Sequence, residues 1–103
     1  MLLRIVDRDG TVREVQARDE GSLMQVLRSF EWGVTAICGG ACACATCHVY
    51  VAPEWISRMP PQHSDERDLI SDLAHGNEAS RLSCQIHLAR ELDGLCVTLA
   101  PDE

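Results

Sequence analysis

With 103 residues, the chain is long enough for one small domain with a modest hydrophobic core. Nine basic and sixteen acidic residues give a formal net charge of −7, and all nine basic residues are arginines. This acidic balance argues against a nucleic-acid partner, and no apolar run approaches the roughly eighteen residues of a membrane-spanning helix. We therefore expect a single domain over residues 1–103 without a membrane span.

The N-terminal segment predicts a β-hairpin. Strand-like runs at residues 3–6 and 11–15 flank a short polar stretch that contains Asp9 and Gly10. An Asp-Gly pair between apolar runs is a strong signal for a tight hairpin turn. The chain should therefore open with two antiparallel strands.

A helix is predicted after the hairpin. Ser22 is followed three residues later by Gln25, which is the spacing of a capping box at a helix N-terminus. Apolar residues then recur at helical spacing, so this face of the helix should lie in the core. These residues are Leu23, Val26, Leu27 and Phe30.

The next segment carries the main chemical signal of the sequence. Cys38, Cys44, Cys47 and Cys84 have the spacing C-x5-C-x2-C-x36-C, with three cysteines in one loop and the fourth far along the chain. Cysteine thiolates are the usual ligands of iron-sulfur clusters, and the other residues of the loop are Gly, Ala and Thr, which leave the backbone accessible. The spacing predicts a [2Fe-2S] cluster and, through it, one-electron transfer without a reaction on a substrate.

Three residues of the loop are candidates for contacts around the cluster. Gly39 and Gly40 can take the positive φ that allows successive backbone N–H groups to converge on an anionic centre. Thr46 can donate its hydroxyl to a cluster sulfur. Such contacts tune a reduction potential. Cys42, two residues before Cys44, is interpreted as a small filler.

Other uses of the cysteines fit less well. A disulfide framework would be expected behind a secretory leader, which the sequence does not show. A structural zinc site usually contains two short cysteine pairs, whereas only Cys44 and Cys47 form one here. A Rieske cluster needs two histidine ligands; His87 follows Cys84 with two residues between them, but His48 follows Cys47 without a spacer. A zinc module that acts through protein contacts remains an alternative.

The second half of the chain alternates between strand and helix signals. Residues 48–52 are predicted to form a strand, and three prolines then break the chain into turns. A second helix is predicted over residues 64–75 with Gly76 as its stop, and residues 95–99 are predicted to form a closing strand. These patterns alone predict a domain of mixed α and β structure.

The second predicted helix carries an acidic stripe. At 100° per residue, Asp65, Asp68 and Asp72 fall within about 60° of one another, and the leucines and isoleucine of the helix point to the other side. Glu66 lies on the apolar side, where only its first-turn position would let it reach solvent. The stripe is either a solvated face whose acids complement the helix dipole or a docking surface.

The cysteine loop resembles that of a known family. Five residues separate the first two cysteines, where plant-type ferredoxins have four. The string CGGACACATCHVYV at residues 38–51 is similar to the [2Fe-2S] ferredoxins of the adrenodoxin and putidaredoxin type, and residues 22–25, 81–86 and 91–94 add to the likeness. The resemblance implies an α+β fold of the β-grasp class, with a mixed sheet, one main helix and a smaller acidic docking helix.

The resemblance also implies a function. Such a ferredoxin carries electrons from an FAD-containing, NAD(P)H-dependent ferredoxin reductase to a monooxygenase of the cytochrome P-450 class. Cys38 and Cys44 would hold the iron nearer the surface, which takes the electron, and Cys47 and Cys84 the inner iron. A ferredoxin that supplies electrons for iron-sulfur cluster assembly is the alternative, because the cysteine spacing does not separate the two roles.

The resemblance assigns docking to the acidic helix. Asp65, Glu66 and Asp72 match acidic positions of the family, and we add Asp68 because it shares the stripe. Arg67 interrupts the acidic run, which departs from the strongest examples of the family.

The remaining expectations concern His48 and the setting of the protein. In the resembled family a histidine after the third cysteine ties the cluster loop to the docking helix, so His48 should act behind the ligands, with His75 as a candidate contact. We expect a monomer in the reducing cytoplasm. Because the chain contains arginine and no lysine, we expect a bacterial host with a GC-rich genome.

Overall fold

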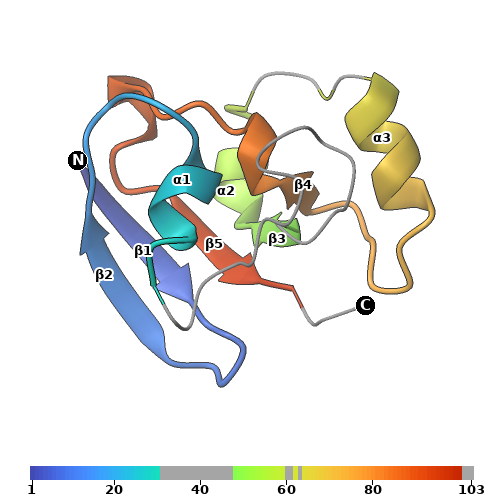
Figure 1. Cartoon of the computed structure of the whole chain (residues 1–103), viewed down its shortest axis with the longest axis horizontal. Helices are drawn as coiled ribbons and strands as arrows, with labels where there is room; N and C mark the ends of the chain where they lie inside the picture. Colours follow the sequence, from blue (N-terminus) through green and yellow to red (C-terminus); the bar gives the residue numbers. More distant parts are fainter. Residues whose placement is uncertain (31–47, 60–61, 63, 101–103) are drawn as a thin grey trace.

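The computed structural model describes residues 1–30, 48–59, 62 and 64–100. Its five strands form one mixed sheet in the order β2-β1-β5-β3-β4 (Figure 1). β1 pairs antiparallel with β2 and parallel with β5, whereas β3 pairs antiparallel with both β5 and β4. The strands are β1 (Leu2–Val6), β2 (Val12–Gln16), β3 (His48–Val51), β4 (Ser80–Leu82) and β5 (Cys96–Leu99).

Short helices accompany the sheet. Three are α-helices, namely α1 (Leu23–Leu27), α2 (Pro53–Ile56) and α3 (Ser64–Ser71), and two are 3₁₀ turns, η1 (Ser83–Gln85) and η2 (Arg90–Leu92). In the part of the chain that the structure describes, none of the helices is long and apolar enough to cross a membrane. The mixed sheet with few helices is the α+β arrangement of a β-grasp fold, which confirms the predicted fold class.

The N-terminal hairpin and the first helix confirm the sequence predictions. Leu2 pairs with Gln16 and Val6 with Val12, so β1 and β2 are joined through the predicted turn. At the start of α1, Ser22 Oγ accepts a hydrogen bond from the Gln25 N–H at 3.4 Å, and Gln25 Oε1 accepts one from the Ser22 N–H at 3.0 Å. This is the expected capping box.

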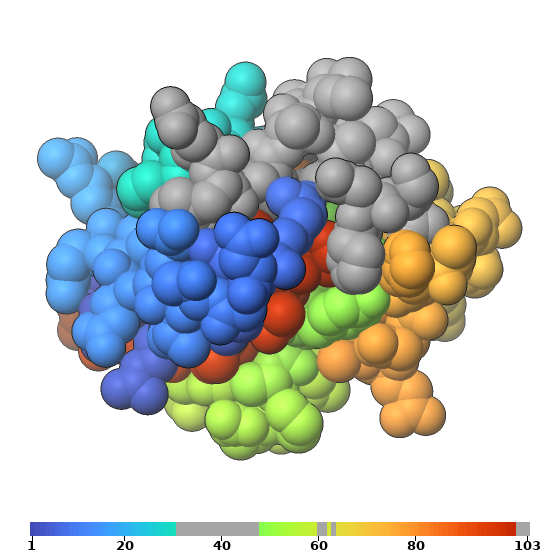
Figure 2. Space-filling model, turned by 90° about the horizontal axis from the view of Figure 1, so that it is seen from below, coloured from blue at the N-terminus to red at the C-terminus, as the bar shows by residue number. Residues whose placement is uncertain are grey.

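The hydrophobic core lies between α1 and one face of the sheet. Leu23, Met24 and Leu27 of α1 are buried, and Val26 and Phe30 are partly buried against them. Buried residues alternate with exposed or half-buried neighbours along β1, as expected for a strand that packs on one face. The α3 end of the molecule lies opposite the N-terminal hairpin in both views (Figures 1 and 2).

The second predicted helix is shorter than expected. It ends at Ser71, so the predicted end at residue 75 is wrong. The Asp72 and Leu73 N–H groups bond three residues back, at 3.2 and 3.1 Å, which tightens the last turn. The chain then folds back, and a Cβ at Gly76 would lie 2.7 Å from the Ile70 carbonyl oxygen, so only glycine fits there without a shift.

The short helix α2 was not predicted. Pro53 was predicted to break the chain into a turn after the strand, but it stands at the start of α2. Proline is well tolerated at the first helical position because its missing N–H would have no partner inside the helix. Its fixed φ therefore favours the start of this helix.

Asp7 stabilises the hairpin turn. Its Oδ1 accepts hydrogen bonds from the Asp9 and Thr11 N–H groups at 2.9 and 3.0 Å, and its Oδ2 accepts one from Arg13 Nε at 2.7 Å. The Arg13 hydrogen bond, helped by the two backbone donors, holds the pKa of this carboxyl below its ordinary value, although burial alone would raise it.

This arrangement predicts a pH-dependent contribution to stability. A lowered pKa in the folded state means that the carboxylate stabilises the fold above its unfolded pKa of about 3.9, and that this contribution is lost as the pH falls toward the folded value. The difference in unfolding free energy between wild type and Asp7→Asn, measured by urea titration, should be constant above about pH 5 and should narrow below it. A difference that widens on acidification would contradict the role of Asp7.

Candidate metal centre

One of the four predicted ligands lies in the described part of the chain. Cys84 is in η1, directly after β4, and is only 6% exposed. The other three, Cys38, Cys44 and Cys47, lie outside the described residues. The same holds for Cys42 and for the three predicted cluster contacts Gly39, Gly40 and Thr46.

The sheet register brings the two ends of the predicted site together. His48, which follows Cys47 in the sequence, is paired with Leu82 across β3 and β4. In this antiparallel pair, the end of β3 that follows the cysteine loop lies beside the end of β4 that leads into Cys84. A ligand set divided between residues 38–47 and Cys84 therefore fits the fold.

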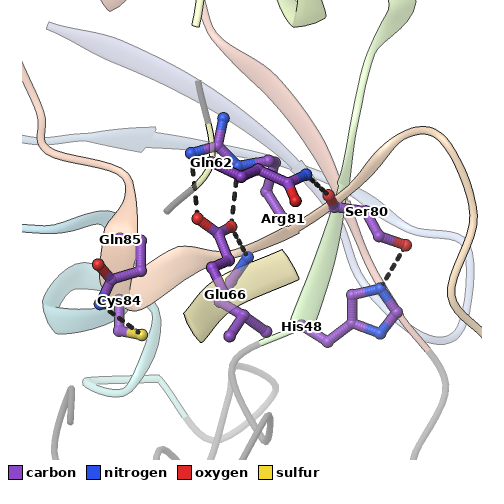
Figure 3. A network of polar contacts seen from close by, with 8 residues as sticks. His48, Gln62, Glu66, Ser80, Arg81, Cys84 and Gln85 are labelled. Carbon is purple, nitrogen blue, oxygen red and sulfur yellow. Dashed lines mark hydrogen bonds and ion pairs between the residues drawn. The ribbon is translucent and has the colours of Figure 1, made fainter. Parts of the chain in front are cut away.

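The environment of Cys84 suits a thiolate ligand. Gln85 Nε2 lies 3.5 Å from Cys84 Sγ and donates a hydrogen bond to it (Figure 3). Among the residues that the structure describes, Cys84 and Cys96 form no disulfide, and Cys96 lies in β5 with intermediate exposure. A buried sulfur with an N–H donor directed at it is a suitable partner for iron, since hydrogen bonds to ligand sulfur are part of iron-sulfur sites.

Glu66 of α3 has a different role from the predicted one. Its side chain is fully buried, so the expectation that it contacts a partner at the surface is wrong. Arg81 Nε donates to Glu66 Oε2 at 2.8 Å and Arg81 Nη2 to Oε1 at 3.4 Å, while the Leu82 N–H donates to Oε2 at 2.9 Å. Helix α3 packs against β4 through this side, which is where the helical pattern had placed Glu66.

The other acidic positions are at the surface. Asp65 and Asp68 are exposed on α3, and Asp72 is exposed one residue beyond the end of the helix. Arg67 is exposed on the same helix. The predicted acidic stripe therefore exists as an exposed feature, with Glu66 excluded from it.

His48 connects three segments around the site. It is 3% exposed, and its Nε2 lies 2.8 Å from Ser80 Oγ in β4. Its ring meets the ring of Tyr50 edge to face at 5.0 Å, and the Tyr50 hydroxyl donates to the His75 carbonyl oxygen. Tyr50 thus lies between the His48 ring and the backbone of His75, four residues beyond the end of α3, and a direct contact between His48 and His75 stays a prediction.

The sequence analysis missed the partners of these side chains. Arg81 had been seen only as part of a family-like string, and Ser80 and Gln85 had no predicted role. The sequence did contain a signal for the Glu66–Arg81 pair, because Glu66 lies on the apolar face of the predicted helix. An acid buried on such a face needs a partner of opposite charge. Nothing in the sequence indicated that Ser80 would face His48.

Fold and site together define an iron-sulfur protein with a β-grasp fold. The family model of the 2Fe-2S iron-sulfur cluster binding domain matches residues 6–89. The chain belongs to this family, as a [2Fe-2S] ferredoxin domain of the adrenodoxin and putidaredoxin type whose cofactor is a [2Fe-2S] cluster.

Characterised relatives agree with this assignment. The chain is 52% identical to ferredoxin CarAc of a Sphingomonas species over 67 residues, which are 65% of this chain and 62% of that protein. It is 40% identical to rhodocoxin of Rhodococcus erythropolis over 100 residues, 95% of this chain and 92% of that protein. It is 36% identical to the mitochondrial adrenodoxin homolog of Saccharomyces cerevisiae over 93 residues, 89% of this chain and 54% of that protein. The matched region therefore spans less than two thirds of ferredoxin CarAc and of the yeast protein.

Solved structures support the fold. A reduced cysteine-to-serine variant of putidaredoxin from Pseudomonas putida matches 97% of this chain and 96% of that chain with a TM-score of 0.90 at 35% identity. Putidaredoxin in its covalent complex with putidaredoxin reductase matches 99% of this chain and 100% of that chain with a TM-score of 0.86, also at 35% identity. The likeness therefore extends over nearly the whole chain.

We expect Cys84→Ser to abolish or strongly reduce cluster retention, because serine oxygen is a poor substitute for a thiolate ligand. Visible absorption together with iron and acid-labile sulfide analysis measures retention. The control Cys96→Ser makes the same replacement of sulfur by oxygen at a cysteine in β5, outside the predicted ligand set, and should keep the cluster. A fully loaded Cys84→Ser protein would remove Cys84 from the ligand set.

We expect Glu66→Ala to destabilise the fold by about 3 kcal/mol or more, because it removes the buried carboxylate that neutralises the Arg81 guanidinium. Asp65→Ala, which removes an exposed acid from the preceding position of α3, should change stability by about 0.5 kcal/mol or less. Denaturant titration of both holoproteins provides the comparison. Equal losses in the two variants would contradict the importance of the buried pair.

Proposed function

We propose that this ferredoxin carries single electrons from an FAD-containing, NAD(P)H-dependent ferredoxin reductase to a monooxygenase of the cytochrome P-450 class. The ligands in this proposal are Cys38, Cys44, Cys47 and Cys84, and the bound [2Fe-2S] cluster supplies one-electron chemistry. The observation that carries the proposal is the exposed acidic surface of α3, which Glu66 joins to the strand leading into Cys84. We call the exposed side chains of Asp65, Asp68 and Asp72 the acidic surface.

The distribution of charge supports a basic partner at this surface. Residues 1–30 contain five arginines and five acids, whereas residues 48–100 contain four arginines and eight acids. The hairpin of β1 and β2 and the helix α3 lie toward opposite ends of the molecule (Figure 2), with β5 beside β1 between them. Because the Glu66–Arg81 pair neutralises itself internally, the surplus of negative charge lies among exposed or half-buried side chains. Such asymmetry orients a protein as it approaches a basic surface.

The relatives support the choice of partners. Putidaredoxin has been captured in a covalent complex with putidaredoxin reductase, and it shares this fold over nearly the whole chain. A carrier that meets two partners in turn benefits from a small, charge-guided interface that releases quickly. An exposed acidic surface beside the predicted cluster site meets this requirement.

The remaining site residues are assigned supporting roles in this proposal. Gly39 and Gly40 would direct backbone N–H groups at the cluster, and Thr46 would donate its hydroxyl to a sulfur. His48 would hold β3 to β4 through Ser80 and so fix the end of the cysteine loop. We further propose a monomeric protein of one domain in the bacterial cytoplasm, where reducing conditions keep thiols free.

Reconstitution tests the proposal. The holoprotein should be reduced by NADH or NADPH through a flavoprotein such as putidaredoxin reductase and should support turnover of a P-450-class monooxygenase. The rate of reduction should fall as ionic strength rises, because salt screens charges at the interface. Activity with an iron-sulfur assembly scaffold, and with no monooxygenase, would favour the alternative role in cluster assembly.

Matched variants test the acidic surface itself. The triple variant Asp65→Asn, Asp68→Asn and Asp72→Asn should reduce the low-salt rate about tenfold, because it removes the attraction to a basic partner. The control variant also removes three negative charges, but at the N-terminal hairpin and the segment after it, through Asp9→Asn, Glu14→Gln and Asp19→Asn. The control should lose much less activity, and both proteins should keep the wild-type visible spectrum. Equal losses would place docking elsewhere.

A further inference from the structure

The side chain of Gln85 is directed at the sulfur of the predicted ligand Cys84. The distance from Gln85 Nε2 to Cys84 Sγ is 3.5 Å, which is within the normal range for a hydrogen bond to sulfur (Figure 3). Cys84 is buried and Gln85 is half-buried, so water competes only partly for this donor. Gln85 had no role in the sequence analysis.

The backbone around Gln85 is held on both sides. On one side, the Leu82 N–H donates to the buried Glu66 carboxylate at 2.9 Å. On the other, the Ile86 N–H bonds to the Ser83 carbonyl at 3.2 Å, and the Ile86 carbonyl accepts from the Leu23 N–H at 2.8 Å. Helices α3 and α1 therefore anchor the two ends of η1, and Gln85 is carried by a fixed turn.

The chemistry of the pair determines which end of the carboxamide faces the sulfur. A ligand thiolate has lone pairs and no proton, so it only accepts hydrogen bonds. The amide NH₂ group is then the end that gains from the contact, as the structure places it. If the carboxamide were rotated so that its oxygen faced the sulfur, the oxygen and the thiolate would repel each other.

We propose that Gln85 raises the reduction potential of the centre by donating this hydrogen bond to Cys84. The inference rests on the proposed role of Cys84 as a ligand. Reduction adds one negative charge, and a donor at a ligand sulfur stabilises the more negative state. Since the iron proposed to take the electron is held by Cys38 and Cys44, the bond acts across the cluster, and its effect should be modest. We expect about a threefold change in the ratio of reduced to oxidised protein at a fixed potential.

The experiment compares midpoint potentials of holoproteins by spectroelectrochemical titration. Gln85→Met keeps the length of the side chain and removes the donor, so its potential should be lower by about 30 mV, which is the threefold change at about 59 mV per tenfold. Gln85→Glu should lower it further, because it replaces the donor by a carboxylate. Gln16→Met, at an exposed position in β2, should match wild type.

A second measurement starts from the wild-type holoprotein. The iron–cysteine stretching bands in the resonance Raman spectrum of the wild-type holoprotein should shift in D₂O, and this shift should be smaller in Gln85→Met or in Gln85→Glu, whichever retains the cluster. A wild-type spectrum without a shift from hydrogen bonding at Cys84, or a Gln85→Met potential equal to wild type, would overturn the proposal.

The test of Gln85 can be distinguished from the test of Cys84 as a ligand. If Cys84→Ser loses the cluster while Gln85→Met keeps the wild-type potential, the ligand assignment stands and only the role of Gln85 fails. If Cys84→Ser keeps the cluster, both fail together. Neither measurement depends on the identity of the reductase or the monooxygenase.

Discussion

The buried carboxylate of Glu66 is the interaction on which the arrangement of the site depends. A carboxylate removed from water is costly unless opposite charge and hydrogen-bond donors surround it. Here Arg81 supplies both, and the Leu82 N–H adds a third donor. Because Arg81 and Leu82 belong to β4, helix α3 is fixed to the strand that leads into Cys84. A loss of this contact would loosen the acidic surface and the predicted ligand at the same time.

The short strand β4 connects the main parts of the site. Its first residue, Ser80, contacts His48, which follows the cysteine loop, and its last two residues contact Glu66. Cys84 and its hydrogen-bond donor Gln85 follow directly. An electron carrier needs its cluster close to the surface that partners touch and needs little rearrangement when it changes oxidation state. A single strand that holds both sides of the site satisfies these requirements with few residues.

The sequence predicted the features that depend on near neighbours. The hairpin turn with Asp9 and Gly10 and the capping box at Ser22 are decided by residues within a few positions of one another, and the structure confirms both. The end of the acidic helix was predicted wrongly because it depends on the return of the chain at Gly76 to the Ile70 carbonyl. The start of α2 was missed because proline was interpreted as a breaker, although at a first helical position it favours a helix.

By itself the sequence determined the class of cofactor, because the number, type and spacing of thiolate donors restrict the metal centre that a chain can hold. It also determined the net charge and the presence of an acidic helix. Only the tertiary structure decided that Glu66 faces inward to Arg81 while Asp65 faces water, that His48 meets Ser80, and that Gln85 reaches the Cys84 sulfur. The residues of the first two pairs are 15 and 32 positions apart, and Gln85 reaches its neighbour only through the turn of η1, so these contacts depend on how the chain packs.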